Sequence, residues 1–281
     1  MKLDKLKSMV KSVDKRNDST FLKTLDKRKL EEIIFHNKTR ELNAENVAKD
    51  QNAFEKYYGN KVYYETIGRS DKYVKDWIIK ETKDLVFLDY ACGNGHNALL
   101  AAQSGAALSI GFDISDISIK NCEKKAETNG IKNSIFLVAD CENTGLPDNC
   151  IDVCICSGML HHLDLSFAIP ELRRIMKPGG KVLCGEALNY NPAIKLYRKL
   201  TPSMRTEYEK EHILNFSDVR FISRFFDVRE MRFWHVVGYL GAKIPILRPI
   251  LNLLDGILEK IPVLRRMAWI FTFVLIKKKA N

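Results

Sequence analysis

The alternation of short β-rich runs with helical stretches, which begins at Leu85, limits the fold of this chain more than any other feature. The β-rich runs are "LVFLDY", "ALSIGFDI", "SIFLVA", "IDVCICS" and "KVLCGEA". Between them lie "HNALLAAQSG", "ISIKNCEKKAETNG" and "AIPELRRIMKPGG", with apolar residues at helical spacing and a glycine near each C-terminal end. Such alternation indicates βαβ units around a parallel sheet. The sequence therefore predicts an α/β fold with a Rossmann-like, doubly wound sheet that binds ligands at the carboxyl ends of its strands.

Two later segments extend this sheet. The runs "RFFDVREMRFWHV" (224–236) and "MAWIFTFVLIKK" (267–278) both indicate strands, so we expect seven strands, mostly parallel. Helix-forming residues and the aromatics Phe54, Tyr57, Tyr58, Tyr63 and Tyr64 precede the first strand. The expected organisation is a basic arm and N-terminal helical cap over 1–84 and a Rossmann-like domain over 85–281, with insertions at 189–222 and 237–266.

Charge and cysteine content indicate which partners and which cellular compartment suit the protein. The net charge of +10 over 281 residues permits nucleic acid, anionic lipid or an acidic substrate as partner. Residues 1–40 mix lysines with aspartates and contain no apolar run, which predicts a solvated, partly helical extension rather than a targeting peptide. The seven cysteines lie in apolar segments, which indicates reduced thiols in an intracellular protein. Cys154 and Cys156 share a strand face without further ligands, so no metal site is predicted.

The stretch "VFLDYACGNGHNALLAA" carries the most informative motif. Gly93, Gly95 and Ala98 fit G-x-G-x-x-G/A, the fingerprint of a loop that holds a dinucleotide pyrophosphate at a helix N-terminus. Asp89, however, ends the strand before this turn and would repel a phosphate. A carboxylate at this place suits a ligand with a cationic part, and S-adenosylmethionine carries both an ammonium and a sulfonium.

Acids also follow the next two strands. Asp113 lies eighteen residues after Gly95, near the spacing at which an acid accepts hydrogen bonds from a ribose. Asp140 ends the third strand with Cys141 beside it, where it could accept from an adenine amino group. A solvated turn residue is the alternative for each acid on its own.

In order, "LDYACGNG", "GFDIS", "VADCEN", "IDVCICSGMLHHL" and "ELRRIMKPGGKVL" resemble the class I S-adenosylmethionine-dependent methyltransferase family, in particular its small-molecule and quinone-type branch. The resemblance covers about residues 85–188. It implies that the glycine turn holds the methionine part, Asp113 the ribose and Asp140 the adenine, and that Ser157 to Leu160 line the methyl donor. Ala91 departs from the family, which usually has glycine there. The cofactor-binding residues expected on this basis are Asp89, Ala91, Gly93, Gly95, Asp113, Ile114, Asp140, Cys141 and Ser157.

His161 and His162 follow the fourth strand, where the methyl group should point. A histidine is a suitable general base for an acceptor hydroxyl or amine. Tyr190, after the fifth strand, is a third catalytic candidate, in a polar and aromatic segment expected to recognise the acceptor. The alternative is that the histidines only pack or cap, since alignment alone can accelerate an in-line displacement.

The sequence thus predicts an enzyme that transfers a methyl group from S-adenosylmethionine to a small-molecule or lipid-like acceptor, leaving S-adenosylhomocysteine. The competing functions are an RNA or other nucleic-acid methyltransferase, a non-catalytic S-adenosylmethionine-binding protein and, more distantly, a nicotinamide dehydrogenase. The fourth strand is followed by "SGML" rather than by Asn-Pro-Pro-aromatic, and neither Pro-Cys nor Thr-Cys is present, which disfavours a nucleic-acid acceptor.

The segment 244–264 repeats isoleucine and leucine at helical spacing, with cations between them. It either packs on the sheet as core or forms an apolar lid or interfacial helix that contacts a membrane surface. The longest apolar run, 267–276, has ten residues, well short of the roughly 20 that span a bilayer, so no transmembrane helix is predicted. We therefore expect a cytoplasmic protein, either free or in peripheral contact with a membrane.

Overall fold

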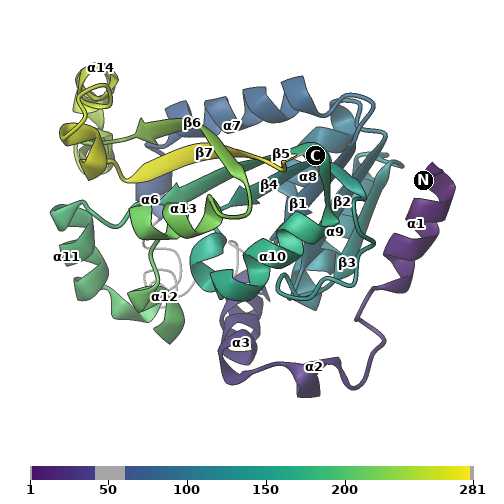
Figure 1. Cartoon of the computed structure of the whole chain (residues 1–281). Helices are drawn as coiled ribbons and strands as arrows, with labels where there is room; N and C mark the ends of the chain where they lie inside the picture. The colour runs from purple at the N-terminus through teal and green to yellow at the C-terminus, as the bar shows by residue number, and fades with distance from the viewer. Residues whose placement is uncertain (1, 42–60, 279–281) are drawn as a thin grey trace.

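A seven-stranded sheet forms the centre of the protein, as predicted (Figure 1). The computed structural model describes residues 2–41 and 61–278. The strand order is β3-β2-β1-β4-β5-β7-β6, and only β7 runs antiparallel to its neighbours. The strands are β1 (Val86–Tyr90), β2 (Leu108–Asp113), β3 (Ser134–Val138), β4 (Ile151–Ser157), β5 (Met176–Ala187), β6 (Asp227–Trp234) and β7 (Ile270–Ile276).

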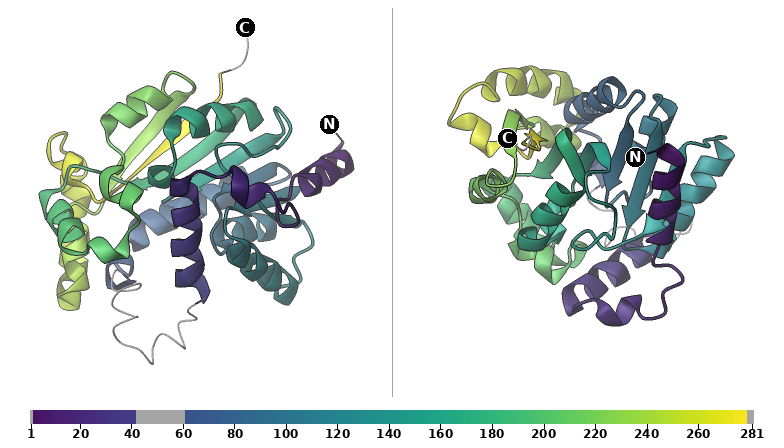
Figure 2. Two further views of the ribbon diagram at one scale, coloured as in Figure 1. Left: turned by 90° about the horizontal axis from the view of Figure 1, so that it is seen from below. Right: turned by 45° about the vertical axis from the view of Figure 1, so that its right-hand side comes forward.

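Helices cover both faces of the sheet, which makes it doubly wound (Figures 1 and 2). Helices α7 (Gly68–Glu81), α8 (His96–Gln103) and α9 (Asp116–Thr128) pack on one face, for example through Trp77 and Ala101 against Phe87. Helices α10 (Leu165–Ile175) and α13 (Phe216–Ile222) pack on the other face, where Leu172 meets Leu88. The buried strands need apolar residues on both faces, which explains their continuous apolar runs.

The N-terminal segment contradicts the prediction of a solvated extension. It forms α1 (Leu3–Ser12), α2 (Phe21–Thr24) and α3 (Lys27–Glu41), and α1 buries Leu6 and Val10 in the main core cluster. The backbone N–H of Lys15 also donates to the carbonyl of Val138 at 2.9 Å. The segment is therefore an integral layer of the fold. Of the early aromatics, Tyr63 and Tyr64 lie on α6 (Lys61–Tyr64), whereas Phe54, Tyr57 and Tyr58 are outside the described residues.

Two groups of short helices flank the antiparallel end of the sheet. Between β5 and β6 lie α11 (Pro192–Leu200), η2 (Pro202–Met204), α12 (Glu207–Glu211) and α13. Between β6 and β7 lie η3 (Gly238–Ala242), η4 (Pro245–Leu247), α14 (Arg248–Leu258) and η5 (Leu264–Met267). Within the described residues, no helix combines the length and apolar content needed to cross a membrane.

Candidate active site

The carboxyl ends of β1 and β2 and the loops after β3 and β4 border one cavity of about 230 Å³. Eight of the nine residues expected to bind the cofactor line it, namely Asp89, Ala91, Gly93, Asp113, Ile114, Asp140, Cys141 and Ser157. The ninth, Gly95, is not among its lining residues. Gly95 caps α8 with φ of 74°, and a Cβ there would lie 2.7 Å from the Cys122 sulfur, so this glycine serves close packing of α8 against α9.

Asp89 lines this cavity and is almost fully buried. Its carboxylate accepts from the backbone N–H of Ala98 at 3.0 Å, in the first turn of α8. Burial raises its pKa to about 7, although this hydrogen bond and the Asn97 side chain lower it. A cationic ligand group nearby would favour the ionised form, which agrees with the preference deduced from the sequence.

Two basic side chains of α3 form ion pairs with the acids at the ends of the second and third strands. Asp113 accepts from the backbone N–H groups of Gly93 and Ser115, both at 2.9 Å, and lies 3.3 Å from Arg40 Nη1. Asp140 pairs with Lys29 Nζ at 2.7 Å. Both carboxylates therefore already receive N–H donors at the places where a ribose and an adenine would offer O–H and N–H donors.

The turn after β1 holds Ala91 with φ of 56°, in the left-handed region. Glycine enters this region freely, and alanine does so at a cost of about 1 kcal/mol. The position at which this chain departs from the family is therefore one where the backbone requires the conformation that glycine prefers.

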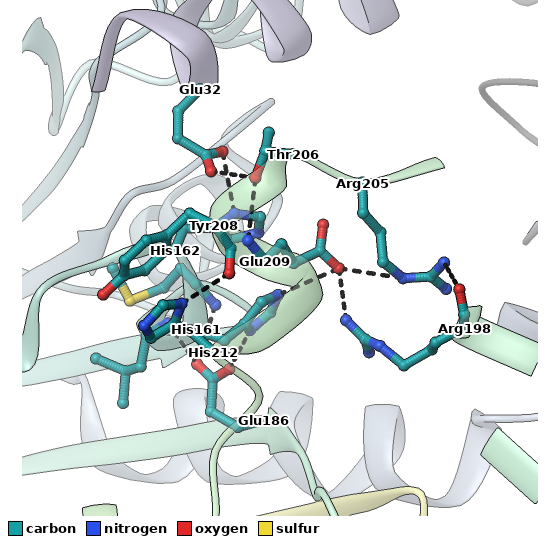
Figure 3. A network of polar contacts seen from close by, with 12 residues as sticks. Glu32, His161, His162, Glu186, Arg198, Arg205, Thr206, Tyr208, Glu209 and His212 are labelled. Atoms are coloured by element: carbon teal, nitrogen blue, oxygen red, sulfur yellow. Dashed lines mark hydrogen bonds and ion pairs between the residues drawn. The ribbon is translucent and has the colours of Figure 1, made fainter. Parts of the chain in front are cut away.

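A second cavity of about 540 Å³ adjoins the first, with His36, Asn97, Ser157, Gly158 and His162 lining both. His161 opens into this second cavity and is held by Glu186, whose Oε2 lies 2.8 Å from His161 Nδ1 (Figure 3). Glu186 Oε1 accepts from the backbone N–H groups of Met159 and Leu160 at 2.9 Å.

Burial sets the protonation of this pair. It lowers the pKa of His161 well below its usual value, and the charge of His162 lowers it further. A neutral His161 that donates from Nδ1 to Glu186 keeps a lone pair on Nε2. That nitrogen is available to accept a proton in the second cavity.

His162 turns instead toward α3. Its Nδ1 lies 3.0 Å from Glu32 Oε2, and its ring is 5.3 Å from the ring of His36. Burial opposes the charged form, but the contact with Glu32 raises the pKa of His162 overall. The two adjacent histidines therefore have different partners and opposite shifts.

The structure separates Tyr190 from the two histidines. Its hydroxyl accepts from the backbone N–H of Phe216 at 3.2 Å, and its ring stacks on Phe216 beside the core. Tyr190 is absent from the lining of the cavities found among the described residues, and this placement favours a packing role. The sequence reasoning in turn missed Lys29, Glu32, His36 and Arg40, because no motif links α3 to strand ends some hundred residues away.

A third cavity, of about 190 Å³, has an aromatic lining that includes Tyr63, Tyr64, Tyr197, Tyr239 and Trp269. Tyr64, Glu209 and Trp269 also line the second cavity, so the two adjoin. On its other side the third cavity reaches Leu240 and Lys243, next to the segment that carries α14. Cavity space thus extends from the histidines to the aromatic third cavity, and from there to the segment that precedes α14.

The sheet and its flanking helices form a Rossmann-like fold, which is also the fold of the methyltransferase structures that this chain resembles. Residues 88–184 match the family model described as "Methyltransferase domain". Over this part of the chain, the match confirms the resemblance to the class I S-adenosylmethionine-dependent methyltransferase family seen in the sequence.

Curated relatives cover the same region. The chain is 34% identical over 119 residues to the ubiquinone/menaquinone biosynthesis C-methyltransferase UbiE of Acidiphilium cryptum, a match that covers 40% of this chain and 47% of that protein. It is 29% identical over 103 residues to the 27-O-demethylrifamycin SV methyltransferase of Amycolatopsis mediterranei, with 36% of this chain and 38% of that protein covered. The matches thus span less than half the length of these relatives.

Among solved structures, the chain resembles a phosphoethanolamine N-methyltransferase of Haemonchus contortus in complex with phosphomonomethylethanolamine and S-adenosylhomocysteine. The TM-score is 0.54 at 16% identity, and the match covers 75% of this chain and 54% of the other. At this identity the likeness concerns the fold alone.

Proposed function

We propose that this protein transfers a methyl group from S-adenosylmethionine to a small-molecule acceptor. The observation that carries the proposal is the single cavity that joins Asp89, the glycine turn, Asp113 and Asp140 at neighbouring strand ends. The residues fit the cofactor, because two of these carboxylates already accept N–H donors from Arg40 and Lys29. Binding would exchange those ion pairs for contacts with the ribose and the adenine.

The bound cofactor supplies an electrophilic methyl group on a sulfonium. The chain orients the acceptor in the second cavity, and His161 Nε2 takes the proton that the accepting atom loses. Glu186 keeps the imidazole in the required tautomer through the 2.8 Å contact at Nδ1. Two of the relatives, a ubiquinone/menaquinone biosynthesis C-methyltransferase and a 27-O-demethylrifamycin SV methyltransferase, support an acceptor of the small-molecule type.

Calorimetric titration tests the cofactor assignment. We expect binding of S-adenosylmethionine and S-adenosylhomocysteine and negligible binding of NAD. Asp113→Asn should weaken binding about 10- to 100-fold through lost charge-assisted hydrogen bonds. Asp116→Asn is the matched control, since Asp116 pairs with Lys120 at the start of α9. Equal affinities of the two variants would overturn the role of Asp113.

We further propose an apolar acceptor that is reached at a membrane surface through α14. This helix exposes its apolar side, with Ile246 in the preceding turn 84% exposed and Leu253 70% exposed. Lys243, Lys260 and Arg266 are exposed around it. An apolar patch of this size rimmed by cations suits the surface of an anionic bilayer.

The polar side of α14 faces the protein, which supports this orientation. Asp255 is fully buried and accepts from the backbone N–H groups of Val237 at 2.8 Å and Gly238 at 3.1 Å. Glu259 pairs with Arg69 at 2.7 Å. Since polar contacts anchor the helix, its apolar residues are left for another surface.

Co-sedimentation with vesicles tests the membrane part of the proposal. The full chain should pellet with vesicles that contain phosphatidylserine, and less with neutral vesicles or at high salt. A protein that stays in the supernatant under all of these conditions would overturn it. A cytoplasmic location, with contact at the inner surface of the membrane, is part of the same proposal, and the seven buried free cysteines agree with a reducing compartment.

A further inference from the structure

Three side chains from two distant parts of the chain converge where the first two cavities meet. Glu32 and His36 lie one turn apart on α3 and so share a helix face. His162 comes from η1 (Leu160–His162), directly after β4. One ligand-type atom of each, Glu32 Oε2, His36 Nε2 and His162 Nδ1, lies within 4.8 Å of the other two. We call these three residues the tripod.

The spacing in the tripod is that of donors around a metal ion. Glu32 Oε2 lies 3.0 Å from His162 Nδ1 and 3.3 Å from His36 Nε2. Zinc binds carboxylate oxygen and imidazole nitrogen at about 2.0–2.2 Å, which places neighbouring tetrahedral ligands about 3.3 Å apart. An ion could therefore enter between these atoms with only small side-chain movements.

Glu32 gives independent support. Its side chain is 7% exposed, yet Oε2 has no partner of hydrogen-bond geometry among the described residues, and neither does His162 Nδ1. A buried carboxylate oxygen without such a partner is costly. A buried carboxylate oxygen that lies within 3.3 Å of two imidazole nitrogens is a suitable ligand for a cation.

Neighbouring side chains orient the carboxylate of Glu32, and two nearby candidate ligands have other partners. The Thr206 hydroxyl donates to the other oxygen, Glu32 Oε1, at 2.5 Å. Glu209, which also lies near the histidines, is paired with Arg198 at 2.7 Å (Figure 3). His161 is bound to Glu186. A site of three protein ligands would match catalytic zinc sites, which keep a further position for water or substrate.

We propose that Glu32, His36 and His162 bind one divalent transition-metal ion of the zinc class. Two imidazoles and one carboxylate suit Zn²⁺, Co²⁺ or Fe²⁺ better than Mg²⁺ or Ca²⁺, which prefer oxygen ligands throughout. His36 and His162 line both the cofactor cavity and the acceptor cavity, so the open position faces the place where the two substrates meet.

This inference rests on the proposed methyl transfer and defines its acceptor as one with a hydroxyl or phenol group. The ion binds the acceptor oxygen as a Lewis acid and lowers its pKa. The O–H bond of the acceptor would break and the proton would pass to His161 Nε2. The oxygen would then form a bond to the methyl carbon while the carbon–sulfur bond breaks, and sulfur would keep that electron pair. No electron is gained or lost by the metal.

Cobalt titration of the chelator-treated full chain tests the site. Absorption spectroscopy should show d–d bands of Co²⁺ bound to nitrogen and oxygen at one equivalent, and Zn²⁺ should displace it. Glu32→Gln and His162→Gln should each weaken binding at least about 100-fold. His212→Gln is the control, because His212 is exposed and stacks on Tyr208.

Thr206→Val keeps the size of the side chain and removes the hydroxyl, which orients Glu32 and also caps α12 by accepting from the backbone N–H of Glu209 at 3.3 Å. It should weaken Co²⁺ binding about 10-fold or more, and its loss of stability should not exceed about 2 kcal/mol, that of one helix cap and one hydrogen bond. Equal Co²⁺ affinity of the wild type and the Glu32→Gln, His162→Gln and Thr206→Val variants would overturn the metal site. Calorimetry with S-adenosylmethionine on the same samples distinguishes failure of the metal site from failure of the proposed methyl transfer. Cofactor binding without metal binding refutes only the metal site. Metal binding without cofactor binding refutes only the proposed methyl transfer.

Discussion

Leu253→Glu should release the protein from anionic vesicles while it leaves the fold intact. Complete burial of a leucine side chain stabilises by about 1.5–3 kcal/mol. Because Leu253 is 70% exposed, a bilayer can recover about 1–2 kcal/mol from it, which corresponds to about a 5- to 30-fold change in partitioning. Repulsion of the new charge by anionic lipid adds about 1 kcal/mol, for a total of about 30- to 150-fold.

The matched control for this change is Phe167→Glu. Phe167 is 61% exposed on α10, away from α14, and the substitution alters net charge by the same amount (Figure 1). The assay is co-sedimentation over a lipid titration, with thermal unfolding of both variants to check that stability changes by no more than about 0.5 kcal/mol. If both variants weaken vesicle binding to the same extent, net charge rather than the apolar side of α14 is responsible, and the proposed orientation is wrong.

Three other changes probe the active site. Burial raises the pKa of Asp89 to about 7, above its value of 3.8 in the unfolded chain. As the pH rises from 4 to 7, the unfolded state therefore releases this proton before the folded state does. The free energy of unfolding of the wild type should fall over this range relative to that of Asp89→Asn. Denaturant unfolding of both proteins across this range measures the difference, and a constant difference would contradict the buried, protonated carboxyl. His161→Ala should lower turnover about 100-fold with cofactor affinity unchanged, and full activity would show that alignment suffices. Arg40→Gln should tighten S-adenosylmethionine binding several-fold by removing the competing ion pair with Asp113, whereas weaker binding in calorimetry would show that Arg40 helps to hold the cofactor.

The sheet was predictable because its strands are buried on both faces and are therefore apolar throughout. β4 matches the predicted run 151–157, and β1, β2 and β3 end within a residue of their predicted ends. β5 is longer than expected, since it begins at Met176 rather than Lys181. There the pattern "IMKPGG" continued the preceding helix by composition, but pairing of Met176 with Ile151 gives that segment an extended backbone. Tertiary pairing decided a boundary that local propensity could not.

The cavity that we propose as the active site was predictable only where its residues follow strand ends. Topology brings Asp89, Asp113 and Asp140 together, so their positions in the sequence were informative. α3 is different, because its composition is mostly charged and resembles a solvated helix. Arg28, Lys29 and Arg40 pair with acids at or after the ends of distant strands, as Lys29 does with Asp140, and these pairings exist only in the folded chain. Glu32 and His36 likewise form a candidate metal site only because the fold brings His162 beside them.

The apolar stripe of 244–264 shows why a periodic pattern does not reveal which way a helix faces. The core interpretation is wrong for most of this stripe, since Asp255 is the residue that α14 buries and its isoleucines and leucines are largely exposed. If α14 rolled to bury Leu253 against the protein, Asp255 would leave two backbone N–H groups without their acceptor and Glu259 would lose Arg69. Each buried N–H donor without an acceptor destabilises the fold by about 1–3 kcal/mol, which is comparable to the stabilisation from burying one leucine side chain. The observed orientation keeps these polar bonds and leaves the apolar side for a surface that needs no hydrogen bonds, and a lipid bilayer is such a surface.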